Sequence, residues 1–407
     1  MMNFKHVSQW FDERLPIVAH TIHHLTSYSA PKNLNFWYYF GSFALLMFVN
    51  QFITGLWLAM FYKPMAEHAF HSVETIMRDV SYGWLIRYMH STGASFFFIV
   101  VYMHMVRGLL YGSYKRPREL LWIVGCLLLV LLIMEAFMGY LLPWGQMSYW
   151  GAQVITSLFE AIPYIGPSVA LFIRGDYTIS DVVLNRFFAL HVVAIPFAFA
   201  GLILLHIIAL HSVGSNNPDG IEIKDNLDAK GVPLDSVPFH PYYTIKDLFG
   251  VSVLLTLFFA VVFYMPEGGG LFLEAPNFEE ANPMATPEHI SPVWYMTPYY
   301  AILRAVPDKL LGVIAMGASL LVWFLLPWLD RNPVKSIRYR GWPHKVALMC
   351  LGISFVGLGI LGMQHPSPVK TMLARIFALV YFLFFITLPI YSRYEKTKPV
   401  PQRLTSH

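Results

Sequence analysis

Four histidines stand out in this chain because they lie inside long apolar stretches. His90 and His104 belong to RYMHSTGASFFFIVVYMHMVRG, and His191 and His206 belong to LHVVAIPFAFAGLILLHIIALH. A side chain that can ionise is unfavourable inside a bilayer and usually marks a function there. Two such residues in each of two stretches point to a shared ligand, although a single histidine in a membrane helix can also be a hydrogen-bonding core residue.

The spacing of these histidines is the same in the two stretches to within one residue. His90 and His104 are 14 residues apart, which corresponds to about 40° around a helix and about 21 Å along it. His191 and His206 are 15 residues apart, or about 60° and about 22 Å, and Pro196 can loosen that helix enough to absorb the extra residue. Haem iron is commonly held by histidine, and helical bundles hold such cofactors. We therefore expect one haem iron between His90 and His191 and a second between His104 and His206.

Glycines occur at the same interval in two further apolar stretches. The members of each pair are again 14 residues apart: Gly41 and Gly55 in one stretch, and Gly125 and Gly139 in the other. Glycine lets a flat ring approach the backbone closely, so these positions predict room for two haems at the same two depths. Pairs of small residues also serve ordinary helix packing; the register shared with the histidines favours a cofactor.

Three arginines lie near the ends of the histidine-bearing stretches, namely Arg87, Arg107 and Arg186. Each lies within a few residues of one of the four histidines. Their guanidinium groups could pair with haem propionates. They could equally extend to the membrane interface, as long basic side chains commonly do.

The composition is that of an integral membrane protein. Of the 407 residues, 56% are hydrophobic and 13% are charged, and the mean hydropathy is +0.52, whereas soluble domains carry roughly 25% charged residues. Only two cysteines occur, Cys126 and Cys350, too few for a disulfide framework or a zinc site. Without a CxxCH motif, covalent attachment of haem through that motif is excluded. The N-terminus lacks a signal-peptide core, and its residues 4–11 suggest a short interfacial helix instead.

Eight stretches are long enough to cross a bilayer, which needs roughly 20 apolar residues in each. They cover residues 36–61, 84–111, 120–142, 182–210, 248–265, 310–329, 346–362 and 372–391. We therefore predict an all-α, polytopic membrane protein with eight transmembrane helices and a four-helix di-haem bundle in its N-terminal half. We divide the chain into this bundle (1–215), an inner connecting loop (216–245) and a C-terminal four-span region with an outer lid (246–407).

Positive charge predicts the orientation of the chain. Lysine and arginine are concentrated in the connections after the second and sixth stretches and in the C-terminal tail. By the positive-inside rule these segments and both termini are cytoplasmic. Two long outer connections, 143–180 and 266–308, are expected to form partly helical lids. The inner connection 212–246 is expected to be an ordered cap.

Several segments resemble signatures of the cytochrome b family, the quinol-oxidising haem subunits of cytochrome bc1 complexes, in the family's order. They are GSFALLMFVNQFITGLWLAM, GWLIRYMHSTGA, MGYLLPWGQMSYWGAQVIT, LNRFFALH, LHSVGSNNPDG, FHPYYTIKD and PVWYMTPYYAILRAVP. The fused C-terminal spans resemble the respiratory subunit, and PVWY with the 15-residue spacing suggests a bacterial type. By this resemblance His90 and His191 bind an outer, low-potential haem b, and His104 and His206 bind an inner, high-potential haem b.

The resemblance also implies a reaction, the Q cycle. Quinol at the outer face gives one electron to a Rieske iron-sulfur protein and the other, through the two haems, to quinone at the inner face, while protons are translocated. The implied partners are the Rieske protein, cytochrome c1, ubiquinone and the lipid bilayer, in a homodimeric complex with no nucleic acid. We expect a bacterial inner membrane. The sequence does not distinguish ubiquinone from menaquinone.

The resemblance assigns an outer quinol pocket to Phe137, Tyr140, Gly151, Pro292, Trp294, Tyr295 and Tyr300. An apolar, aromatic cleft with few polar groups suits a quinone ring. The three tyrosines are the expected catalytic side chains of the pocket.

One departure from the family concerns proton transfer. Many relatives have PEWY, whose glutamate is thought to accept a quinol proton, whereas this chain has Val293. Glu135 lies four residues before Gly139, on the side expected to face the haem, where an ionisable group needs a partner or a task. With Tyr140 it could replace the missing carboxylate as a proton exit, or it could form a structural hydrogen bond to the neighbouring span.

At the inner face, the family positions that line the quinone reduction site are occupied by His211, Ser215, Lys246 and Asp247. A histidine and an aspartate that face the two quinone carbonyls, with a lysine nearby, provide donors and a proton route. Taken without the resemblance, His211 would be read as an interfacial polar residue.

Three other classes of protein have intramembrane histidines or many spans but fit this sequence less well. A transporter would use intramembrane histidines as a proton relay, but it predicts inverted repeats that the sequence lacks. A di-haem membrane anchor of another quinone-linked dehydrogenase would not need eight spans or PVWY. A purely structural subunit leaves the histidine register as coincidence.

Overall fold

The computed structural model describes residue 13 and residues 28–405; the interfacial helix expected over residues 4–11 lies outside the described residues. Eight helical segments in this part are long and apolar enough to cross a membrane. They are α3 (Tyr39–Ala59), α5 (Gly83–Tyr111), α6 (Glu119–Leu141), α9 with α10 (Asp181–Ala189 and Ile195–Val213), α11 (Phe239–Tyr264), α13 (Lys309–Leu329), α14 (Trp342–Gly362) and α15 (Pro368–Tyr394). The prediction of eight spans is confirmed. The fifth span begins well before the expected residue 248, because its polar inner end is still helical.

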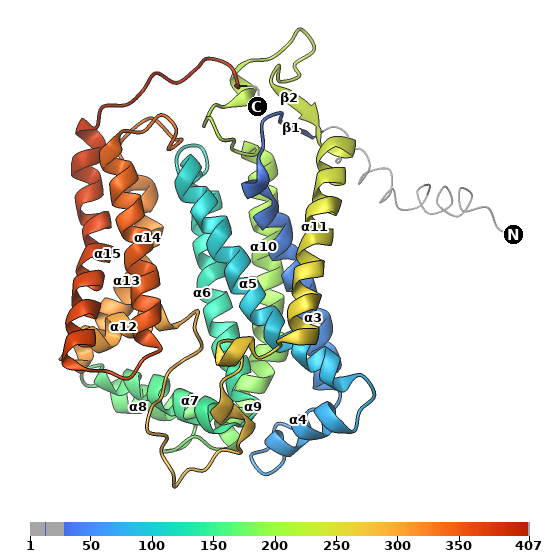
Figure 1. The fold of residues 1–407 in the computed structure, drawn as a ribbon, viewed down its shortest axis with the longest axis vertical. Helices are drawn as coiled ribbons and strands as arrows, with labels where there is room; N and C mark the ends of the chain where they lie inside the picture. The colour runs from blue at the N-terminus through green and yellow to red at the C-terminus, as the bar shows by residue number, and fades with distance from the viewer. Residues whose placement is uncertain (1–12, 14–27, 406–407) are drawn as a thin grey trace, which may run out of the picture.

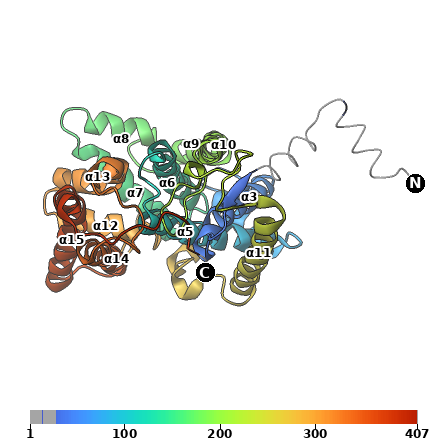
Figure 2. The same cartoon turned by 90° about the horizontal axis from the view of Figure 1, so that it is seen from above.

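The helices form two groups (Figure 1, Figure 2). In the first group α3 packs on α5, α6 packs on α10, and α11 lies against α3 and α5. In the second group α13, α14 and α15 pack together, and α13 also contacts α6. The division of the chain at residues 215 and 245 stays a prediction, and α11 packs on the N-terminal bundle although it follows the proposed boundary.

Short helices cover one end of the bundle, at the bottom of Figure 1. They are α4 (Ala69–Arg78), α7 (Gln146–Leu158), α8 (Gly166–Arg174) and α12 (Thr297–Ala305). The two long outer connections are therefore partly helical, as expected, whereas α4 was not predicted. An isolated bridge between Gly145 and Glu280 joins the two connections, so the lids form one layer over this end.

The opposite end is closed by β1 (Ser29–Pro31), which pairs antiparallel with β2 (Ser236–Pro238). Asp235, beside β2, receives Lys32 Nζ at 2.8 Å and Arg403 Nε at 2.6 Å. The Arg403 guanidinium holds the pKa of the Asp235 carboxyl well below its usual range. The first strand and the C-terminal tail thus meet at the same end of the bundle, as an even number of spans requires.

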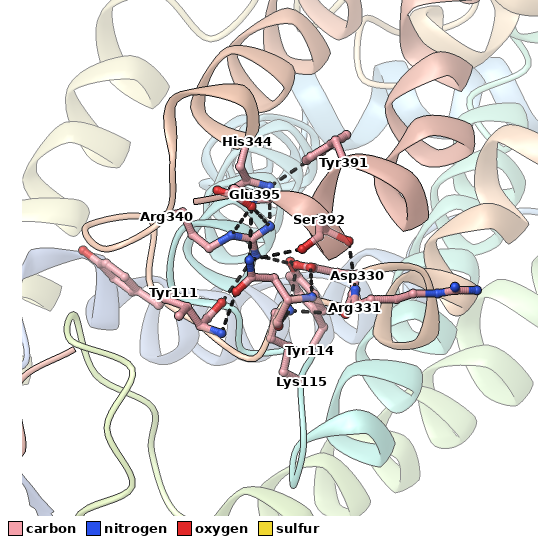
Figure 3. A network of polar contacts seen from close by, with 12 residues as sticks. Tyr111, Tyr114, Lys115, Asp330, Arg331, Arg340, His344, Tyr391, Ser392 and Glu395 are labelled. Carbon is pink, nitrogen blue, oxygen red and sulfur yellow. Dashed lines mark hydrogen bonds and ion pairs between the residues drawn. The ribbon is translucent and has the colours of Figure 1, made fainter. Parts of the chain in front are cut away.

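A buried ionic cluster joins the two groups of helices at this end (Figure 3). Asp330 lies between Arg340 Nη1 at 2.8 Å, Lys115 Nζ at 2.8 Å and the Tyr114 hydroxyl at 2.6 Å. Burial opposes ionisation of Asp330, but Lys115 and Arg340 hold its pKa at about 2. Arg340 Nη2 also pairs with Glu395 at 2.7 Å. Removing one partner would leave a buried charge uncompensated, so the cluster connects α5, the α13–α14 loop and the end of α15.

Candidate functional site

The four intramembrane histidines meet in two pairs. The ring centroids of His90 and His191 are 6.1 Å apart, and those of His104 and His206 are 6.3 Å apart. An imidazole nitrogen binds a transition metal at about 2 Å, so two rings on opposite sides of one ion have centroids roughly 6 Å apart. Each pair therefore has the separation that two axial ligands of one iron need. The expected pairing of the histidines is confirmed.

The extra residue between His191 and His206 is absorbed where the sequence suggested. Residues Leu190–Ala194 form a π-helical turn between α9 and α10, directly before Pro196. A π turn holds one more residue than an α turn and is often found at functional sites. Proline also lacks the N–H that would continue the α-helical ladder. This local widening places His191 opposite His90.

Glycines lie against the outer histidine pair. A Cβ added at Gly139 would lie 2.3 Å from His191 Cε1, and one at Gly55 would lie 3.0 Å from His90 Cε1. Close-packed interiors do not tolerate an atom at 2.3 Å without displacement of its neighbour. The absence of a side chain at Gly139 is therefore a condition for the observed position of the His191 ring.

The inner pair is surrounded in the same way but with more room. A Cβ at Gly41 would lie 3.4 Å from His104 Cε1, and one at Gly125 would lie 3.4 Å from His206 Cε1. Each of the four glycines singled out by spacing thus lies against a different one of the four histidines. The prediction of glycines at the same two depths as the histidines is confirmed: Gly55 and Gly139 lie at one histidine pair, and Gly41 and Gly125 lie at the other.

The outer rings are held through Nδ1. His90 Nδ1 lies 2.9 Å from Thr54 Oγ1. His191 Nδ1 lies 2.9 Å from the backbone oxygen of Glu135 and 3.1 Å from its carboxylate Oε1. A metal-binding histidine usually donates its second N–H to such a partner, which fixes the ring. Nε2 is then the nitrogen left for a metal on both outer rings.

The chemistry of this donor set fits haem. Among the described residues no group of three or more His, Cys, Asp or Glu side chains converges on one point, so a bare metal ion would lack ligands. A haem iron brings four ligands in its own ring and needs only axial ones. Two histidines with glycine gaps beside them match that requirement.

The three arginines near the histidines have different surroundings. Arg107 Nη2 donates to the Asn216 backbone oxygen at 2.9 Å, and Arg186 Nη1 donates to the Phe172 backbone oxygen at 2.6 Å. Arg87 is partly buried one turn before His90. Its backbone oxygen accepts from Ser91 Oγ at 3.1 Å, whereas its guanidinium has no hydrogen bond or ion pair with another described residue. A guanidinium in that position is available to an anionic group such as a propionate.

Most residues of the expected outer quinol pocket belong to one aromatic cluster, which includes Phe137, Tyr140, Trp294 and Tyr295. Tyr295 stacks on Phe98 with centroids 3.8 Å apart, and Trp294 Nε1 donates to Ser95 Oγ at 3.1 Å. The cluster also buries Val293, next to Pro292 in the chain. The PVWY segment is therefore packed onto α5.

Like Pro292, Gly151 and Tyr300 are not members of this cluster. A Cβ at Gly151 would lie 3.9 Å from Tyr140 Cε1, so Gly151 lies beside the Tyr140 ring. Tyr300 instead donates its hydroxyl to the Ile290 backbone oxygen at 3.2 Å and packs under Arg304. The structure gives Tyr300 a partner in the lid.

A carboxylate that sequence reasoning missed lies in the outer site. Tyr140 donates its hydroxyl to Glu274 Oε2 at 3.0 Å, and Asn277 Nδ2 donates to the same hydroxyl at 2.8 Å. Burial raises the pKa of Glu274 to about 7. Glu135 does face the histidines, as expected, but its carboxylate contacts His191. The carboxylate that contacts Tyr140 is thus that of Glu274.

At the opposite end, part of the expected quinone reduction site is brought together by Tyr28. The rings of Tyr28 and His211 stack with centroids 4.7 Å apart, and the Tyr28 hydroxyl lies 2.9 Å from Ser215 Oγ. The sequence reasoning did not include Tyr28, because it lies far from the other residues in the chain. This group combines a hydroxyl, an imidazole and an aromatic face.

The other two residues of that site lie on α11. Ser42 donates its hydroxyl to Asp247 Oδ1 at 3.3 Å, and Lys246 Nζ lies 5.1 Å from the centroid of the Tyr243 ring. Lys246 is exposed, whereas Asp247 is partly buried. Asp247 is therefore anchored to α3, and Lys246 lies at the surface beside the Tyr243 ring.

Comparison with known proteins covers nearly the whole chain. Residues 25–214 match the family described as Cytochrome b/b6/petB, and residues 280–382 match Cytochrome b(C-terminal)/b6/petD. The chain is 58% identical over 405 residues to a cytochrome b of Allochromatium vinosum, covering 98% of both chains. It is 49% identical over 403 residues to one of Rhodospirillum rubrum, covering 98% of this chain and 96% of that one. A chain of a hyperthermophilic respiratory Complex III has the same fold, with a TM-score of 0.88, 41% identity and coverage of 95% of this chain and 99% of that one.

Proposed function

This chain belongs to the cytochrome b family and is the haem-carrying subunit of a quinol:cytochrome c oxidoreductase, and we propose that it holds two b haems, one in each histidine pair. A di-haem anchor of another dehydrogenase is not favoured, because the similarity covers both halves of the chain. The observation that carries the proposal is the matching separation of the two histidine pairs, 6.1 and 6.3 Å between ring centroids.

When bound, each haem supplies one-electron transfer, so the two together connect the two faces of the membrane. His90 and His191 would hold one haem at the outer level, and His104 and His206 would hold the other at the inner level. The glycines beside these rings keep side chains out of the space that the haems need. Arg87 would hold a propionate of the outer haem by a charge-assisted hydrogen bond.

The outer aromatic cluster is the proposed site of quinol oxidation, with Phe137, Trp294 and Tyr295 as its apolar walls. Quinol loses two electrons and two protons when it becomes quinone, so the site needs a proton acceptor. Glu274 is the better placed candidate for that role, because it contacts Tyr140 and burial raises its pKa to about 7. A base whose pKa lies near the working pH is the most efficient proton acceptor. The Glu135 hypothesis stays a prediction that the same experiments test.

The inner site would reduce quinone with His211, Ser215 and Asp247 as hydrogen-bonding groups, and with the exposed Lys246 as a route for protons from the solvent at the inner face. Tyr28 supports this proposal by linking the first two of these residues. Because an imidazole and a carboxyl group both exchange protons readily, they suit a reaction that consumes protons at this face.

The chain would work within a larger membrane complex. Its proposed partners are a Rieske iron-sulfur protein, which takes the first electron from quinol, cytochrome c1 and a second copy of the complex. We place it in a bacterial inner membrane with both termini in the cytoplasm. The meeting of β1 with the C-terminal tail at the lysine- and arginine-rich end supports this orientation. We take ubiquinol as the substrate that the resemblance implies.

A reduced-minus-oxidised spectrum of the purified complex tests the haem proposal. We expect two b-type haems for each copy of this chain and quinol-dependent reduction of cytochrome c. Substitution His206→Leu should remove the inner haem alone, whereas His365→Leu, in the loop between α14 and α15, should keep both. A complex that contains no haem, or that keeps both haems in the His206 variant, would refute the proposal.

A further inference from the structure

The four haem-facing histidines differ in one respect. Of the four, only His191 has a carboxylate within ion-pairing distance among the described residues: Glu135 Oε1 lies 3.1 Å from its Nδ1. His90 has the neutral Thr54 hydroxyl in the equivalent position. The two histidine pairs therefore have similar ring separations, but only the outer pair has a carboxylate, that of Glu135, beside one of its rings.

Glu135 meets the His191 ring with a hydrogen-bonding backbone oxygen and a charged carboxylate. Its backbone oxygen lies 2.9 Å from Nδ1, and its carboxylate lies 3.1 Å from the same atom. Gly139, one turn later on α6, leaves room for the ring on its other edge. The side chains of His191 and Glu135 are only 14% and 21% exposed, so solvent screens their interaction weakly. The second carboxylate oxygen, Oε2, is buried without a hydrogen-bond partner.

We propose that Glu135 is a positioning residue whose carboxylate, 3.1 Å from His191 Nδ1, lowers the reduction potential of the outer haem. This inference rests on the proposed function, because it requires an iron on Nε2. A carboxylate partner makes a metal-bound imidazole a stronger electron donor. A more basic axial ligand stabilises the ferric state relative to the ferrous state, and the hydrogen bonds around a haem ligand are among the means by which a protein sets its potential. Since the inner pair lacks a carboxylate partner, Glu135 favours electron transfer from the outer haem to the inner one.

The test is a redox titration of both haems in the intact purified complex. Glu135→Gln keeps an oxygen that can accept from Nδ1 but removes the negative charge. We expect the outer haem to become easier to reduce by at least tenfold in the ratio of ferrous to ferric form, which is about 59 mV for one electron. The inner haem should keep its potential. The low-spin signal of the outer haem in electron paramagnetic resonance should shift as well.

Two further variants separate charge from structure. Glu119→Gln makes the same change at the other end of α6 and should shift neither haem. Glu135→Asp keeps the charge and should give an outer potential closer to that of the unchanged protein than Glu135→Gln does. An outer potential that does not change in a Glu135→Gln complex with both haems, or an equal shift of both haems, would overturn the inference. If the unsubstituted complex contains no haem, it is the proposed function that fails.

Discussion

Glu274→Gln tests whether the outer site uses this residue as its proton acceptor. The glutamine has nearly the same shape and can still receive the Tyr140 hydroxyl, which lies 3.0 Å from the carboxylate in the structure. What it lacks is the capacity to take up a proton. The substitution therefore removes one chemical property and leaves the packing of the lid largely unchanged.

The expected change in the rate of quinol oxidation follows from the pKa of Glu274. Burial raises the pKa of Glu274 from 4.5 to about 7, and a base must be ionised to accept a proton. The ionised fraction then rises from about one tenth at pH 6 to about nine tenths at pH 8, so quinol oxidation should rise nearly tenfold over this interval. A positioned base commonly contributes a factor of about 100 or more. We expect Glu274→Gln to be slower by about that factor, with a flat pH profile.

The same pKa has a consequence for stability. A carboxyl group whose pKa is raised on folding stabilises the folded state fully below pH 4.5, and that contribution is lost as the pH rises through 7. A pKa difference of this size corresponds to roughly 3 kcal/mol. The thermal stability of the intact complex should therefore fall between about pH 5 and pH 8, and it should fall less in the Glu274→Gln variant.

The assay is quinol-dependent cytochrome c reduction by the intact complex across this pH range. Glu279→Gln, an exposed carboxylate of the same lid, is the matched control and should keep both rate and profile. Glu135→Gln should keep the rise with pH if Glu274 is the acceptor. A Glu274→Gln enzyme that retains the rise, or a Glu135→Gln enzyme that loses it, would refute the reasoning.

Two further substitutions test the bundle. Gly139→Ala should displace the His191 ring and lose the outer haem, because the added Cβ would lie 2.3 Å from that ring. Gly125→Ala should keep both haems, because its Cβ would lie 3.4 Å from the His206 ring. Haem spectra measure the difference, and an equal loss of haem in both variants would contradict the prediction. Asp330→Asn should destabilise the complex by about 3 kcal/mol or more, because Arg340 is fully buried and would lose a charged partner. Thermal unfolding measures this loss of stability. An unchanged midpoint would show that the ionic cluster around Asp330 does not stabilise the complex.

Much of the site could be predicted from the sequence because membrane helices are regular. A bilayer fixes the length of each span, and a helix fixes the rise per residue. Spacing alone therefore placed His90 opposite His191 and His104 opposite His206, and it placed the four glycines at the same two depths. The spacing of 15 against 14 also indicated that one residue is absorbed near Pro196, whereas only the structure showed that a π turn absorbs it.

Contacts between segments far apart in the chain were decided only by the tertiary structure. The outer connection 266–308 contains several acidic residues, and no periodicity distinguishes Glu274 from the others. Only the folded lid brings it to Tyr140, and only burial there raises its pKa. In the same way Tyr28 reaches His211, and Glu135 turns to His191 and away from Tyr140. Helix geometry determines which residues share a depth, whereas loop packing and desolvation determine which carboxylate meets which partner.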